Sequence, residues 1–183
     1  MRIIGGMWRG KKLADLQGKQ TRSTSDRARE SLFNLLNNYL YQTERGWGDI
    51  FFADVFAGTG AVGVEALSRG AKFVLFFENN GLALKCLKNN TKDIENVTIM
   101  GDALKPAKLS PIDVVFMDPP YAQGLWEKAV SAFVQAGGID KNTLIIIETD
   151  KSENAIIPSG FTEIDRRSYG RNTFVFFKMT PDM

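Results

Sequence analysis

Residues 50–63 read "IFFADVFAGTGAVG", and this stretch decides the fold class. Its first seven residues are apolar apart from Asp54, which is the composition of a strand buried in a sheet. Gly58, Gly60 and Gly63 follow with the spacing G-x-G-x-x-G, which forms a tight turn from such a strand into a helix. We therefore predict an open α/β sheet in which a ligand binds at this turn, at the carboxyl end of the strand.

The alternation of strand and helix patterns continues along the chain. Apolar runs typical of strands lie at 72–78, 97–100, 112–118 and 143–149, and amphipathic segments typical of helices at 24–40, 60–70, 81–90 and 125–138. Thr24 or Ser25 is the expected N-cap of the first helix. Two β-rich pieces around Tyr169-Gly170 predict a closing hairpin. Together these patterns predict a mostly parallel sheet with helices on both faces and an antiparallel edge strand from the C-terminal hairpin.

Length and composition limit the function classes. The 183 residues suit one domain. We place it at 23–183 and treat 1–22 as a basic N-terminal arm or hairpin. The absence of histidine excludes Ser-His-Asp catalysis and the usual zinc sites, and it leaves Cys86 as an ordinary packed or half-exposed thiol. No apolar run is long enough for a signal peptide or a membrane span, so we expect a cytoplasmic protein with no membrane partner. We also expect a monomer that binds no metal.

Charge is distributed unevenly along the chain. The formal net charge is +2, but residues 1–30 hold eight basic and three acidic side chains and carry +5, which leaves −3 on the rest. A basic end on a mildly acidic body is typical of a protein that meets a polyanion at that end. Charge alone fits a solvated basic tail equally well.

The glycine turn fits two cofactors. Glu78 follows Gly58 by 20 residues and can accept from ribose hydroxyls in a nicotinamide dinucleotide or in S-adenosylmethionine. Asp54 favours the second, because a pyrophosphate about 6 Å from its carboxylate would cost roughly 3 kcal/mol per charge pair, whereas S-adenosylmethionine brings positive charge. Asp102 in "MGDA" is placed to accept from an adenine amine. Asp54 and Asp102 fit ordinary N-cap or turn positions equally well.

The segment "DVVFMDPPYAQG" (113–124) carries the strongest chemical signal. A rigid turn would explain its prolines, but neither the aromatic residue that follows them nor the position beside the glycine turn. A carboxylate and a backbone carbonyl that accept the two N–H groups of an exocyclic amine direct the nitrogen lone pair towards a methyl group. Asp118 would supply the carboxylate and Pro119 the carbonyl, while Tyr121 would stack on an unstacked base.

The chain resembles a known family over essentially its whole length. The matching segments are "MRIIGGMWRGKKL", "RSTSDRARESLFN", "DVFAGTGAVGVEALSRGA", "FFEN", "GDA", "VVFMDPPYAQGLWEKAV" and "YGRNTFVFF". In this order they resemble the RsmD-type bacterial 16S rRNA (guanine(966)-N2)-methyltransferases. The glycine turn and DPPY are shared by many amino-methyltransferases, whereas the first two segments are much more specific. The resemblance implies a seven-stranded Rossmann-like methyltransferase fold, S-adenosylmethionine as cofactor, and rRNA methylation of a guanine.

The resemblance also implies the site residues. The predicted cofactor contacts are Asp54, Phe56, Gly58, Gly60, Glu78, Asn79, Asp102 and Ala103, and the predicted catalytic residues are Asp118, Pro119, Pro120 and Tyr121. The expected partner is 16S rRNA, in the small ribosomal subunit or its assembly intermediate.

Spacing favours RNA over DNA as the substrate. Only 57 residues separate Gly60 from Asp118, and 62 residues follow Tyr121. Both segments are needed to complete the sheet, so no room is left for a separate DNA-recognition domain. RNA binding must then come from the basic arm and the shape of a folded RNA. The predicted phosphate contacts are Arg9, Lys11, Lys12, Arg22, Arg27 and Arg29. Arg27 and Arg29 fit ordinary helix-surface positions equally well, and Arg27 also fits a position closing over the cofactor.

Three other functions remain open from the residues themselves. Another amino-methyltransferase would act on adenine N6 of nucleic acid or on a protein glutamine, although glutamine enzymes tend to carry Asn in place of Asp118. A non-catalytic rRNA-binding assembly factor would not need an intact DPPY motif and glycine turn. A nicotinamide oxidoreductase lacks an obvious proton donor and has Asp54 in an unfavourable place.

Overall fold

The computed structural model describes residues 1–16, 26–120, 124–153 and 155–181. The expected N-cap residues Thr24 and Ser25 and the predicted site residues Arg22 and Tyr121 lie outside these ranges.

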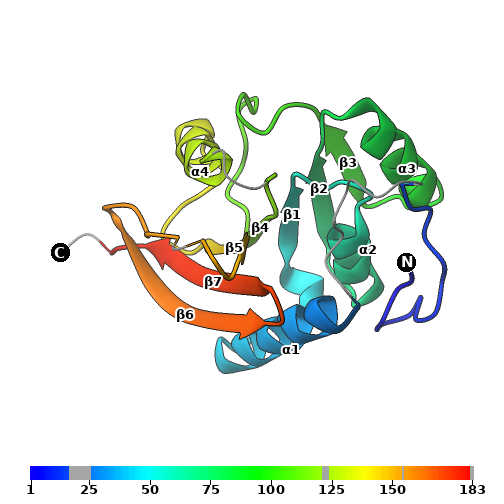
Figure 1. Cartoon of the computed structure of the whole chain (residues 1–183), viewed down its shortest axis with the longest axis horizontal. Coiled ribbons are helices and arrows are strands. Elements are labelled where there is room, and N and C mark those ends of the chain that lie inside the picture. The colour runs from blue at the N-terminus through cyan, green and yellow to red at the C-terminus, as the bar shows by residue number, and fades with distance from the viewer. Residues whose placement is uncertain (17–25, 121–123, 154, 182–183) are drawn as a thin grey trace.

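One seven-stranded sheet organises the chain, as predicted, in the order β3-β2-β1-β4-β5-β7-β6 (Figure 1). Its strands are β1 (Phe51–Val55), β2 (Phe73–Phe77), β3 (Val97–Met100), β4 (Val114–Met117), β5 (Leu144–Asp150), β6 (Phe161–Tyr169) and β7 (Asn172–Met179). The first five are paired in parallel, and the C-terminal hairpin is antiparallel. Its second strand, β7, pairs with β5, so that β6 forms the edge of the sheet.

The connections position the site. From β1 the chain winds outwards to β2 and β3 on one side, and it then returns to place β4 and β5 on the other side. Ligands of such sheets bind at the carboxyl ends of the strands where the winding direction changes, which is between β1 and β4. Val55 is in register with Phe77 of β2 and with Met117 of β4, so the three strands end at one level.

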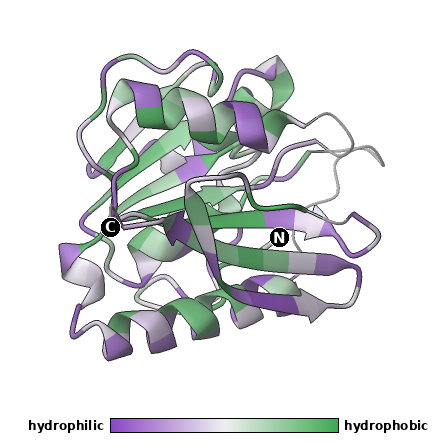
Figure 2. Cartoon of the chain, turned by 90° about the vertical axis from the view of Figure 1, so that its left-hand side faces the viewer, coloured by the Kyte–Doolittle hydropathy of each residue, from purple (hydrophilic) through white to green (hydrophobic). Residues whose placement is uncertain are grey.

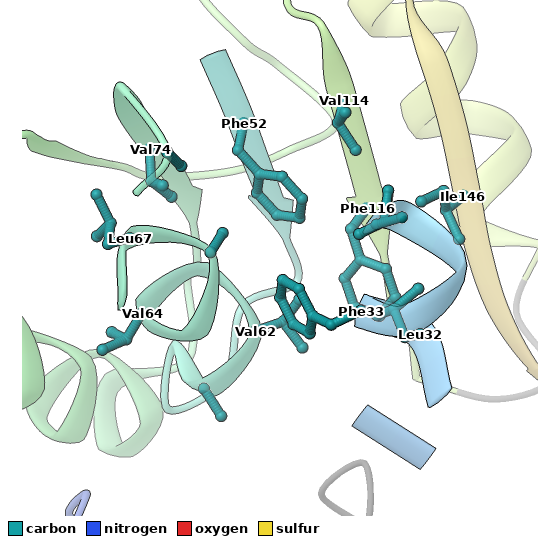
Figure 3. Packing of buried hydrophobic residues seen from close by; sticks show 14 of the residues in the cluster. Leu32, Phe33, Phe52, Val62, Val64, Leu67, Val74, Val114, Phe116 and Ile146 are labelled. Carbon is teal, nitrogen blue, oxygen red and sulfur yellow. The ribbon is translucent and has the colours of Figure 1, made fainter. Parts of the chain in front are cut away.

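Helices cover both faces of the sheet, which confirms the predicted layers. The apolar residues of α1 (Asp26–Gln42), α2 (Ala61–Ser68) and α3 (Gly81–Thr91) share one buried cluster with alternate strand residues, as Figure 3 shows for Phe33, Val64 and Phe116. The other face packs against α4 (Leu125–Ala136) in a second cluster. Figure 2 shows hydrophobic colour along the central strands between these layers. A short 3-10 helix, η1 (Trp47–Asp49), leads into β1, and no helix in the described ranges is long and apolar enough to span a bilayer.

The described part of the N-terminal arm is a hairpin that packs on the domain. Arg2 and Lys12 form an antiparallel bridge, as the sequence predicts, and Ile3 and Leu13 are buried in the cluster that contains α1 and α2. The hairpin lies beside α2 and α3 (Figure 1), where the Ala14 N–H donates to the side chain of Asn90 at 2.7 Å.

Two polar side chains of α2 hold the hairpin. The fully buried Glu65 carboxylate accepts from the backbone N–H groups of Ile4 and Gly5 at 2.7 and 2.8 Å. The Ser68 hydroxyl donates to the Gly5 carbonyl at 2.6 Å. Gly6 approaches so closely that a Cβ on it would overlap the Ser68 carbonyl oxygen, and its φ of 75° also requires glycine. The hairpin is therefore fixed to α2 by backbone contacts.

Candidate functional site

Asp54 lies on β1 one residue before the end of the strand, and it is 2% exposed. Its Oδ2 accepts a hydrogen bond from the backbone N–H of Gly63 at 2.8 Å, which satisfies an otherwise unpaired donor in the first turn of α2. Burial raises the pKa of Asp54 to about 7; the Gly63 hydrogen bond lowers it, and the charge of Glu78 raises it. Asp54 thus anchors α2 against β1, and its contact with a cofactor stays a prediction.

The turn after β1 contains three residues in the left-handed region. Phe56 has a φ of 61° although it is not glycine, which is a strained conformation of the kind that clusters at functional sites. Gly58 has a φ of 57°, and a Cβ on it would meet nothing within 4 Å. A Cβ on Gly60 would overlap Leu87, so here the missing side chain makes room for the core. The missing side chain therefore leaves space for a ligand at Gly58, whereas at Gly60 that space is filled by the core, and the contacts of both residues with a cofactor stay predictions.

Glu78 joins the end of β2 to this turn. Its Oε2 accepts from the Gly58 backbone N–H at 2.7 Å, and its Oε1 accepts from the Asn80 backbone N–H at 2.6 Å. The Asn80 side chain caps α3 by accepting from the backbone N–H groups of Leu82 and Ala83. Asn79, a predicted cofactor contact that lies between Glu78 and Asn80, is exposed. A half-buried carboxylate is thus held at the edge of the glycine turn by backbone donors.

Asp102 and Ala103 follow β3 at the same end of the sheet. Oδ1 of Asp102 accepts from the Leu104 backbone N–H at 2.9 Å, which is an Asx-type turn. Ala103 is buried in the cluster on the α4 face. The geometry thus bears out the turn position of Asp102, while its contact with an adenine amine stays a prediction.

Asp118, Pro119 and Pro120 begin where β4 ends. The Asp118 backbone N–H donates to the Val55 carbonyl at 3.2 Å, so the chain still follows β1 at this residue. Asp118 is half-buried, Pro119 is buried and Pro120 is exposed. Asp118 thus stands one residue beyond Met117 and Glu78 one residue beyond Phe77, at ends that are both in register with Val55.

Sequence reasoning missed two polar residues near this end of the sheet. Glu148 on β5 is 2% exposed, and its Oε1 accepts from the side chain of Asn172 on β7. An acid at the end of the apolar run "LIIIE" was the available signal. Because β5 neighbours β4, Glu148 lies next to the strand that leads to Asp118, whereas Asn172 lies one strand farther away on β7.

The predicted RNA contacts separate into two groups. Arg9, Lys11 and Lys12 are exposed on the hairpin, where the Lys11 ammonium lies 5.4 Å from the ring centre of Trp8, and Arg27 is exposed on α1. Arg29 is 0% exposed, so the prediction of a phosphate contact does not fit it. Its Nη2 donates to the Arg2 carbonyl at 2.7 Å and to Asp26 at 2.9 Å, which ties α1 to the hairpin.

The helical pattern could not reveal the burial of Arg29, because it arises when the hairpin covers that face of α1. Burial lowers the pKa of Arg29, and the Asp26 charge raises it.

The arrangement has the chemistry for a neutral or cationic ligand with hydroxyl and amine donors. Carboxylates that follow β3, β2 and β4, on Asp102, Glu78 and Asp118, accept hydrogen bonds and repel phosphate, and β1 separates the last of these strands from the other two. The space above Gly58 lets a ligand approach the turn closely.

Comparisons with known proteins agree with this geometry. A family model described as conserved hypothetical protein 95 matches residues 1–178. Relatives named ribosomal RNA small subunit methyltransferase D include one from Haemophilus influenzae, 38% identical over 93% of this chain and 89% of the relative. Another, from Escherichia coli, is 34% identical over 82% of this chain and 75% of the relative.

Solved structures with the same fold cover nearly the entire chain. A candidate methyltransferase from Escherichia coli has a TM-score of 0.82 at 30% identity and covers 98% of this chain and 97% of its own. A candidate methylase from Haemophilus influenzae has a TM-score of 0.75 at 33% identity and covers 98% of both chains. The fold is therefore the Rossmann-like methyltransferase fold, as the resemblance implied.

Proposed function

The chain belongs to the RsmD family, described as conserved hypothetical protein 95, and from this premise we propose that it methylates the exocyclic N2 of a guanine in 16S rRNA. The methyl donor is S-adenosylmethionine, and the partner is the small ribosomal subunit or its assembly intermediate in the cytoplasm. One observation carries the proposal: the acid that begins DPPY stands level with the acid beside the glycine turn, with β1 between them.

The acidic residues at the carboxyl ends of the strands fit S-adenosylmethionine as the methyl donor. S-adenosylmethionine supplies a methyl group on a positively charged sulfur and contains no phosphate. The Glu78 carboxylate accepts from the Gly58 backbone N–H in the glycine turn, and its proposed role is to accept from the ribose hydroxyls as well. Asp102 accepts from the adenine amine, and the ionised form of Asp54 favours the positive charge. A nicotinamide dinucleotide would bring its pyrophosphate close to these carboxylates, which disfavours that cofactor.

Asp118 and Pro119 act on the base. The Asp118 carboxylate accepts one N–H of the guanine amine and the Pro119 carbonyl accepts the other, which aims the nitrogen lone pair at the methyl group. When the nitrogen has taken the methyl group and S-adenosylhomocysteine is left, the nitrogen would lose a proton to Asp118 or to water, so no histidine is needed. Tyr121, which lies outside the described residues, is proposed to stack on the base after it leaves its neighbours in the RNA.

The hairpin supplies a fixed basic surface for the RNA. Arg9, Lys11 and Lys12 are exposed on an element whose backbone is bonded to Glu65 and Ser68. A rigid basic element binds phosphates with less loss of conformational entropy than a flexible tail. The solvated-tail interpretation of the same charges does not account for this anchoring.

Two measurements test the proposed function. Equilibrium titration should find binding of S-adenosylhomocysteine and not of NADH; binding of NADH alone would contradict it. Small-subunit particles from a strain that lacks the gene should then receive a tritiated methyl group, found as N2-methylguanosine after digestion of the RNA. N6-methyladenosine would instead identify an adenine enzyme, and RNA binding without transfer would identify a non-catalytic assembly factor.

A further inference from the structure

Glu148 and Asp118 occupy equivalent positions on neighbouring parallel strands. Ile147 of β5 is in register with Met117, the last residue of β4, and Glu148 and Asp118 are the next residues along the chain. Neighbouring strands lie about 4.8 Å apart. The two acids therefore stand side by side at the carboxyl edge of the sheet.

The pleat turns both acids towards the same face. Phe116 and Ile146 precede them by two residues, and both belong to the buried cluster that contains α1 and α2. Figure 3 shows the Phe116 and Ile146 side chains as neighbours on that face. Side chains two residues apart on a strand share a face, which puts Glu148 on the α1 side of the sheet. Asp118 follows the end of β4, but its backbone N–H still bonds to the Val55 carbonyl of β1, so we extend the same alternation to Asp118.

The direction of the Glu148 side chain is fixed by β7. Asn172 donates its side-chain N–H to Oε1 of Glu148, and Asn172 is itself only 7% exposed. Exclusion of water from such a carboxylate increases both the strength of its hydrogen bonds and the cost of facing another acceptor. Glu148 is thus suited to distinguish a donor from an acceptor.

We propose that Glu148 selects guanine by accepting the N1–H that lies beside the reacting N2 amine. This proposal rests on the proposed function, in which Asp118 and Pro119 accept the two N–H groups of that amine. Guanine presents N1–H and N2–H donors next to each other, so two neighbouring carboxylates match this edge of the base. Adenine presents an unprotonated N1 at the same place, which a carboxylate repels.

The test combines a protein variant with a base analogue. 2-Aminopurine keeps the N2 amine of guanine but has an unprotonated N1. Reconstituted small-subunit particles carry either base at the position that the wild-type protein methylates, and kcat/KM is measured for both. Wild-type protein should prefer guanine by about tenfold to a hundredfold, the range for one hydrogen bond to a charged group. Glu148→Gln should reduce kcat/KM for guanine and bring the two bases close to equality.

The variant separates recognition from a structural role. In Glu148→Gln the side-chain amide oxygen can still accept from Asn172, and the thermal unfolding of this variant should resemble that of wild-type protein. Asp150→Asn, two residues along the same face of β5, is the matched control and should keep the wild-type preference. An unchanged preference in Glu148→Gln would overturn the inference, and so would an equal loss in Asp150→Asn. A wild-type protein that methylates no guanine would instead contradict the proposed function.

Discussion

The Glu78 carboxylate accepts a hydrogen bond from the Gly58 backbone N–H at 2.7 Å. This bond joins two features that lie 20 residues apart, the glycine turn after β1 and the acid that follows β2. Parallel pairing of β1 with β2 brings them together, because Val55 and Phe77 are in register. The acceptor proposed for the cofactor is thus already oriented by the backbone around it.

Replacing this acceptor should weaken cofactor binding. In Glu78→Gln the amide must direct its NH2 group towards the Gly58 or the Asn80 backbone N–H, so one of the two hydrogen bonds is lost. We expect the affinity for S-adenosylhomocysteine, measured by isothermal titration calorimetry, to fall about tenfold to a hundredfold. Glu95→Gln, an exposed acid between α3 and β3, is the control. An unchanged affinity in the first variant would exclude Glu78 from the cofactor site.

The raised pKa of Asp54 predicts a pH dependence of stability. Below its ordinary value of 3.8 the group is protonated in both folded and unfolded chains. As pH rises towards about 7, the unfolded chain releases this proton and the folded protein keeps it, so the free energy of unfolding falls. Above about pH 7 both forms are ionised and the decline stops.

Asp54→Asn removes this titration but can still accept from the Gly63 N–H. We expect the free energy of unfolding of the variant, measured with urea, to increase relative to that of the wild-type protein by about 3 kcal/mol between pH 5 and pH 8, since each unit of pKa shift is worth 1.36 kcal/mol. A difference that does not change with pH would mean that Asp54 is ionised throughout.

Gly6 and Gly10 separate two effects of glycine in the hairpin. Both have positive φ, at 75° and 87°, but a Cβ on Gly6 would overlap the Ser68 carbonyl oxygen, whereas one on Gly10 would meet nothing within 4 Å. Gly10→Ala should cost about 1 kcal/mol of backbone strain, and Gly6→Ala should cost at least about 2 kcal/mol more. Denaturant unfolding measures both; equal losses would mean that the hairpin is not docked on α2 in solution.

The hairpin charges should affect RNA binding and not cofactor binding. Changing Arg9 and Lys11 together to Ala should lower RNA affinity. It should also reduce the slope of log K against log salt by up to about two, because each phosphate contact contributes about one to that slope. Affinity for S-adenosylhomocysteine should stay the same. Lys72→Ala with Lys141→Ala, two exposed lysines near the amino ends of β2 and β5, is the matched control. Equal loss of RNA and cofactor binding would contradict the division of roles.

Most of the fold could be predicted because its signals are local. Apolar runs and glycine turns locate the strands, and observed boundaries such as Phe51–Val55 differ from the expected ones by one or two residues. The insertion of β7 beside β5 depends on tertiary pairing, for which the hairpin sequence carries no local signal. The acids at strand ends were found because parallel strands end at one level.

What sequence reasoning missed depends on contacts between distant segments. Arg29 has the spacing of a helix-surface residue, but the hairpin buries it. Gly60 belongs to a ligand-binding motif, yet Leu87 of α3 occupies the space that a Cβ at this position would take. Glu148 becomes relevant only after the register of β4 and β5 is known.

The central claim is that the Asp118 carboxylate accepts a hydrogen bond from the amino group of a guanine that lies beside the methyl donor. The most direct measurement is single-turnover methyl transfer to small-subunit particles by Asp118→Ala, with S-adenosylhomocysteine affinity measured on the same preparation. We predict that the variant binds the cofactor product with wild-type affinity and forms no detectable N2-methylguanosine. Formation of N2-methylguanosine at the wild-type rate would contradict the account.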